Sequence, residues 1–154
     1  MAVGSSTRPR ERAAAYAAAA MDGPPQKALV LIVARELASN LATPMFLIDG
    51  RGDLVFYNEA AEQLLGKPFA ELGSMSSTKW GEMLSLARPD GSPLRRRDSP
   101  PGVAFTQQRP AHARLRATAF DGKARECEVT AYPLFARTGE MHGVVTIFWE
   151  TEAS

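Results

Sequence analysis

The chain has 154 residues, 45% of them hydrophobic, which suffices for one domain with extensions that needs neither disulfide nor metal to fold. Lys and Arg number 18 against 17 Asp and Glu, and the resulting net charge of +1 argues against nucleic acid as a partner. A single cysteine cannot form an internal disulfide, and no Cys or His pair has the spacing of a zinc site. These features predict a cytoplasmic protein without structural zinc.

The first segment, residues 1–25, is rich in Ala and Arg and is expected to be a flexible lead. Its alanine run is too weakly apolar for a signal peptide, and no later segment has the roughly 20 apolar residues of a membrane span. Gly23-Pro24-Pro25 marks the boundary before the folded part. We expect a flanking helix over residues 26–42, a domain over residues 43–151 and a tail over residues 152–154.

An amphipathic helix is predicted from Lys27 to Leu41, because apolar residues recur there at spacings of three and four. A stripe this wide favours contact with a second copy of the chain, and packing on the chain's own sheet is the alternative. The residues of this stripe that we assign to a homodimer interface are Leu29, Val30, Val33, Leu37 and Leu41.

The segment from Pro44 to Gly66 reads as a strand, a tight turn, a second strand and a helix. Glycines in the turn over residues 49–53 supply the positive φ that a hairpin needs. Asn58 ends the second strand, and its side chain is expected to cap the helix that begins at Glu59.

This entry segment resembles that of the PAS domain family, and the resemblance extends from Ala70 to the end of the chain. Trp149-Glu150-Thr151 is similar to the Asp-x-Thr with which many PAS domains end. The resemblance implies an α+β fold with a five-stranded antiparallel sheet and short flanking helices. Turns at Asp121-Gly122 and over residues 138–140 support the later strands. The expected strands are Phe46–Ile48, Leu54–Tyr57, Ala113–Ala119, Arg125–Pro133 and Val144–Trp149.

Alternation along the last strands assigns side chains to the two faces of the sheet. Cys127 shares a face with Val129 and opposes charged Glu126 and Glu128, so the Cys127 face is expected to look inward. The side chains that we expect to line an internal cavity are Leu47, Phe56, Trp80, Met83, Ala113, Leu115, Ala117, Cys127, Val129, Ala131, Thr146 and Phe148. The outward set on the last strand, which we add to the dimer interface, is Val145, Ile147 and Trp149.

The residues of the inner wall can be compared with those that bind cofactors in known PAS domains. Flavin-binding members use amide side chains on these strands, and the corresponding positions here are Ala117, Cys127 and Phe148, which offer no comparable hydrogen bond. Haem-binding members supply a histidine from a central helix, whereas His112 and His142 are both expected at the surface. We therefore expect neither haem nor flavin, and no metal.

Two further features have more than one interpretation. Cys127 is expected to be a buried, unreactive thiol rather than a redox sensor, because its neighbours are acidic and it faces the core. Arg95-Arg-Arg97 with Arg88 forms a basic cluster that is interpreted as a solvated loop, with contact to an anion or an acidic partner as the alternative.

No catalytic motif is present, so we expect no enzymatic activity. The leading hypothesis is a homodimeric sensory and signal-transduction module that binds a small apolar or amphipathic ligand and signals to an effector protein or domain. The first alternative is a ligand-free protein–protein interaction module. The second is a haem-based gas or redox sensor.

Overall fold

The structure is a computed structural model, and it describes residues 24–136 and 139–151. The predicted tail and all of the predicted lead except Pro24 and Pro25 lie outside these residues. No helix in the described part of the chain has the length and apolarity needed to cross a bilayer. In chain order the elements are α2 (Pro24–Ser39), β1 (Met45–Asp49), β2 (Leu54–Tyr57), α3 (Glu59–Leu65), α4 (Phe69–Leu72), α5 (Ser77–Met83), β3 (Ser85–Ala87), η3 (Arg96–Asp98), α6 (Pro100–Gln107), β4 (Ala111–Thr118), β5 (Ala124–Phe135) and β6 (Met141–Glu150).

One antiparallel sheet in the order β2-β1-β6-β5-β4-β3 forms the centre of the fold. The α+β architecture and the antiparallel pairing agree with the prediction, but the described residues form six strands rather than five. The additional strand is β3, which pairs with β4 through only three residues. A strand this short shows no alternation that would distinguish it from the end of a helical region.

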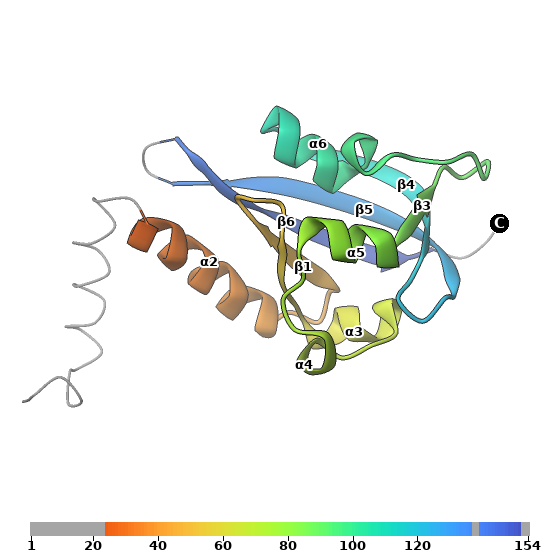
Figure 1. The fold of residues 1–154 in the computed structure, drawn as a ribbon, viewed down its shortest axis with the longest axis horizontal. Helices are drawn as coiled ribbons and strands as arrows, with labels where there is room; N and C mark the ends of the chain where they lie inside the picture. Colours follow the sequence, from red (N-terminus) through yellow and green to blue (C-terminus); the bar gives the residue numbers. More distant parts are fainter. Residues whose placement is uncertain (1–23, 137–138, 152–154) are drawn as a thin grey trace, which may run out of the picture.

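The two faces of the sheet are covered by different helices, and in Figure 1 α6 and α2 lie on opposite sides of the long strands β5 and β6. We call the face that carries Phe46, Leu115 and Phe148 the inner face, since these residues belong to the larger hydrophobic core. The outer face carries Met45 and Leu47, which pack with α2 in a second cluster.

Asn58 connects α2, β1 and α3, and it is only 2% exposed. Its Oδ1 accepts hydrogen bonds from the backbone N–H groups of Ala61, at 3.0 Å, and Met45, at 3.1 Å. Its Nδ2 donates to the carbonyl oxygens of Ala38 and Thr43, both at 2.9 Å. The predicted cap of α3 is therefore confirmed, and the same side chain also fixes the end of the flanking helix.

The flanking helix packs on the outer face through alanines rather than through its large side chains. Ala34 and Ala38 are 9% and 0% exposed, respectively, whereas Val33 and Leu37 are each 59% exposed. The helix ends at Ser39, two residues earlier than predicted. The small side chains of Ala34 and Ala38 allow the helix to approach the sheet closely. The larger apolar side chains of Val33 and Leu37 remain exposed to water.

Candidate functional site

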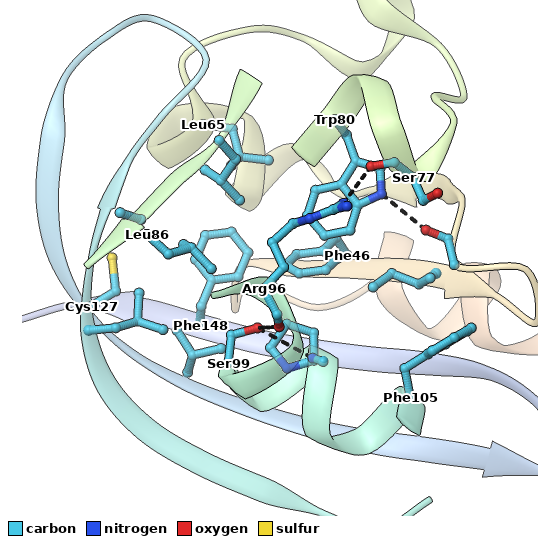
Figure 2. A pocket seen from close by; sticks show the side chains of 18 of the residues that line it. Phe46, Leu65, Ser77, Trp80, Leu86, Arg96, Ser99, Phe105, Cys127 and Phe148 are labelled. Atoms are coloured by element: carbon cyan, nitrogen blue, oxygen red, sulfur yellow. Dashed lines mark hydrogen bonds between the residues drawn. The ribbon is translucent and has the colours of Figure 1, made fainter. Parts of the chain in front are cut away.

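A cavity of about 250 Å³ lies between the inner face of the sheet and the segments that cover it, α5, η3 and α6. Side chains from β4, β5 and β6 form its wall, and Leu64 and Leu65 at the end of α3 add to one side. Figure 2 shows this space with Leu65, Leu86 and Phe148 around it. Most of the lining is apolar, as is typical of small-molecule sites.

Three aromatic rings form one wall of the cavity. The Phe46 ring centroid lies 5.9 Å from that of Trp80 and 5.8 Å from that of Phe148. Trp80 Nε1 donates a hydrogen bond to the carbonyl oxygen of Gly52, which anchors α5 to the turn between β1 and β2 at 3.1 Å. Gly52 has φ of 89°, the conformation predicted for this turn.

Arg96 lies along one side of the cavity and connects η3 with α5. Its guanidinium carbon lies 5.6 Å from the centre of the Trp80 ring, and Nη1 donates to the carbonyl oxygen of Ser77. Figure 2 shows the side chain extending from near Ser99 toward Ser77 and Trp80. Arg96 is exposed, so a charged side chain lies at the edge of the apolar cavity.

Six of the twelve predicted cavity residues line the cavity: Trp80, Leu115, Ala117, Cys127, Val129 and Phe148. Ala131 and Thr146 are buried, Met83 packs against the inner core, and Ala113 is half-buried, but these four do not line the space.

The assignment of Leu47 and Phe56 to the cavity is wrong. Both residues pack in the outer cluster, where the guanidinium carbon of Arg35 lies 4.6 Å from the centre of the Phe56 ring. Phe46 and Ile48 of β1 face the cavity instead. The error is one residue of register, because neighbouring side chains of a strand point to opposite faces.

The predicted interface residues lie on the outer side of the molecule. Val145 and Ile147 pack in the outer cluster under α2, and Trp149 is 39% exposed. Four of the remaining residues are on α2, with Leu41 just beyond its end and 37% exposed. Leu29 and Val30 are half-buried.

The two histidines differ from each other in burial. His112 is exposed and lies beside Thr130 and Glu128 on the outer face, as expected. His142 was expected at the surface but lies within β6 and is 5% exposed, so that expectation is wrong. In the described ranges 24–136 and 139–151, no three or more His, Cys, Asp and Glu side chains group as they would to hold a metal ion.

Cys127 is buried on the inner face, where it is 4% exposed. Burial raises the pKa of its thiol to about 11, and the negative charge of Glu150 adds to the effect. The thiol is therefore neutral at physiological pH, which is the state expected of an unreactive cysteine.

Four arginines line the cavity and were not predicted there: Arg51, Arg96, Arg97 and Arg125. The interpretation of the Arg95–Arg97 cluster as merely a solvated loop is thus incomplete. The spacing in β5 offered a signal for Arg125, because it lies two residues before inward-facing Cys127. No pattern in the sequence brings Arg51 or Arg97 to the same space.

Comparison with known proteins agrees with this architecture. The family described as the PAS fold matches residues 38–154. No curated protein matches the chain.

Three solved structures illustrate the similarity in fold. The PAS domain of a Colwellia psychrerythraea protein has a TM-score of 0.58 at 17% identity, covering 79% of this chain and 97% of that one. The Rhodobacter sphaeroides LOV protein has a TM-score of 0.58 at 13% identity, covering 81% and 69%. The PAS domain of Bordetella pertussis BvgS has a TM-score of 0.55 at 17% identity, covering 80% and 86%. This chain belongs to the PAS-fold family.

Proposed function

We propose that this chain is a non-enzymatic sensory module that binds a small apolar or amphipathic molecule in its cavity and passes this signal to an effector protein or domain. The observation that supports the proposal is the cavity of about 250 Å³ between the sheet and α5, η3 and α6. The space is partly open to solvent and lined mostly by apolar side chains, so a ligand there would cover apolar surface that the protein itself leaves uncovered.

We also propose that the ligand is neither haem nor flavin. Ala117, Cys127 and Phe148 line the cavity and lack the amide groups that would read a flavin ring. Similarity to a LOV protein concerns the fold, and these three side chains argue against the same chemistry here.

A homodimer is the proposed route by which the signal leaves the cavity. Val33 and Leu37 of α2 and Trp149 of β6 expose apolar surface on the outer side of the molecule. A second copy that contacts these side chains would remove them from water. The strand β6 carries Phe148 in the cavity next to Trp149 at the surface, so one element connects the two sites.

Native mass spectrometry of the full chain, purified without added ligand, tests the cavity proposal. We expect an extra mass in the range of a small organic molecule, which is lost under denaturing conditions. If the measured mass is that of the chain alone and no compound of a small-molecule library binds, the ligand-sensing proposal is wrong. The alternative, a ligand-free protein–protein interaction module, would then remain. An absorption spectrum checks the cofactors, because a stoichiometric Soret or flavin band would contradict their exclusion.

A further inference from the structure

The charged side chains around the cavity all have the same sign. Arg51, Arg96, Arg97 and Arg125 line it, and the lining contains no Asp, Glu, Lys or His. In the whole chain, by contrast, 18 basic residues balance 17 acidic ones. This local excess of positive charge around an apolar space favours a ligand that carries a negative charge.

Arg125 is the arginine best placed to bind such a charge. Its side chain is 15% exposed, and it extends from the same face of β5 as Cys127. Its Nη1 is buried and finds no hydrogen-bond partner among the described residues. A guanidinium keeps its proton and its five N–H donors, so a buried Nη1 needs an acceptor. Arg125 lines the cavity, so a ligand there supplies this acceptor when the guanidinium turns to expose Nη1, which is closed to solvent in this structure.

Asp121 is the acidic group that faces this guanidinium, and it occupies only one side of it. Its Oδ2 lies 3.4 Å from Arg125 Nη2, while its Oδ1 accepts a hydrogen bond from the backbone N–H of Lys123. The Lys123 hydrogen bond and the nearby Arg125 lower the pKa of Asp121, so its carboxylate stays charged at neutral pH. Arg125 therefore has charge compensation on Nη2, whereas Nη1 has no acceptor among the described residues.

The size and lining of the cavity describe the rest of the ligand. Its volume of about 250 Å³ exceeds the roughly 150 Å³ of a cavity that holds one benzene ring, which gives space for roughly eight to twelve heavy atoms. Phe46, Leu65 and Phe148 offer no hydrogen bonds along the wall. A hydrocarbon chain fits this lining, and the single unpaired nitrogen of Arg125, with its two N–H groups, suits one carboxylate.

We propose that the cavity binds a medium-chain monocarboxylate, with its carboxylate on the guanidinium of Arg125 and its hydrocarbon chain along the aromatic wall. This inference rests on the proposed function, since it names the class of ligand for the same cavity. The exposed Arg96 and Arg97 attract the anion to the cavity, and Arg125 binds its acid group.

Three eight-carbon probes test the charge of the ligand: octanoate, 1-octanol and octylammonium. Binding is followed by fluorescence of the full chain carrying Trp149→Phe, which leaves Trp80 on the cavity wall as the reporter. We expect octanoate to bind at least tenfold more tightly than 1-octanol, and octylammonium to bind most weakly. Equal affinity for octanoate and 1-octanol would overturn the inference.

Variants then test the role of Arg125. Arg125→Gln should weaken the affinity for octanoate about tenfold and leave that for 1-octanol unchanged. Asp121→Asn should raise the affinity for octanoate, because it removes the negative charge that competes for the guanidinium. Arg114→Gln, an exposed arginine on the opposite face of β4, is the matched control and should change neither affinity. If Arg125→Gln does not fold, the gain in Asp121→Asn and an intermediate affinity in Arg125→Lys still test the proposal.

The results also separate this inference from the proposed function. If native mass spectrometry finds a ligand but octanoate does not bind, or binds independently of Arg125 and Asp121, the monocarboxylate assignment is wrong and the sensor proposal stands. If no ligand is found and no probe binds, both are wrong.

Discussion

At the scale of single residues, Asn58 and Cys127 support the site in different ways: Asn58 lies outside the cavity, and Cys127 lines it. Asn58 satisfies backbone groups of three segments, so the position of α2 depends on it. Cys127 fills part of the inner wall as a small apolar group whose thiol pKa is raised by burial. Both side chains are deeply buried, and changes to either should be measurable in the stability of the fold.

Replacing Asn58 with Ala should lower the free energy of unfolding by about 2–4 kcal/mol, because it leaves buried backbone donors and acceptors without partners. Urea denaturation measures the change. Asn40→Ala is the matched control, since Asn40 is exposed and donates only to the carbonyl oxygen of Glu36. A loss no larger than that of the control would show that Asn58 does not connect α2 to the sheet.

The raised thiol pKa of Cys127 predicts a specific pH dependence of stability. The folded state keeps the proton up to about pH 11, whereas the unfolded chain releases it near pH 9, so the wild type should lose stability relative to Cys127→Ala as the pH rises between these values. The difference approaches about 2–3 kcal/mol. Urea denaturation of both proteins from pH 8 to 10.5 measures it, and a constant difference would contradict the buried thiol.

At the scale of elements, the cavity depends on how closely η3 and α6 approach each other. Ser99 caps α6, accepting a hydrogen bond from Gly102 N–H and donating one to the carbonyl oxygen of Arg96. A Cβ at Gly102 would overlap that carbonyl oxygen and lie 2.7 Å from Cα of Arg97. The absence of a side chain at Gly102 therefore allows η3 to carry Arg96 and Arg97 to the cavity.

Gly102→Ala should lower the free energy of unfolding by about 1–3 kcal/mol, because the new methyl group meets rigid backbone. Gly81→Ala is the matched control within α5. There the Cβ meets only the guanidinium of Arg96, which is a flexible end, so the helix propensity of Ala should keep stability within about 1 kcal/mol of the wild type. Denaturation of both variants is the measurement, and equal stability would contradict the close contact at Gly102.

The sequence predicts some strands and cavity residues but not others, and the difference depends on whether the signal is local. Hairpin turns and long alternating strands predicted β5 and β6, because both signals are local. Leu47 was misplaced because all four residues from Met45 to Ile48 are apolar and buried, so their pattern does not reveal which side faces the cavity. Arg51 and Arg97 reach the cavity only through tertiary packing, which no local pattern encodes.

At the scale of the whole molecule, the outer side remains only partly covered. The flanking helix protects Leu47, Val145 and Ile147 but leaves Val33 and Leu37 mostly exposed. Single exposed apolar residues are common on proteins, but these two occupy one side of α2, and Trp149 at the end of β6 is exposed as well. The proposed homodimer would bury this apolar surface.

The double variant Val33→Glu with Leu37→Glu should be a monomer, because unpaired carboxylates in a desolvated interface cost several kcal/mol. Sedimentation velocity measures the state, and circular dichroism checks that the variant is folded. Thr78→Glu with Gln107→Glu adds the same two charges at exposed positions outside α2 and should remain a dimer. If the α2 variant stays folded and dimeric, the interface lies elsewhere and α2 packs only on the sheet of its own chain. If it becomes monomeric while the control does not, α2 connects the two copies, and octanoate titration of the monomer then measures whether binding in the cavity is coupled to association.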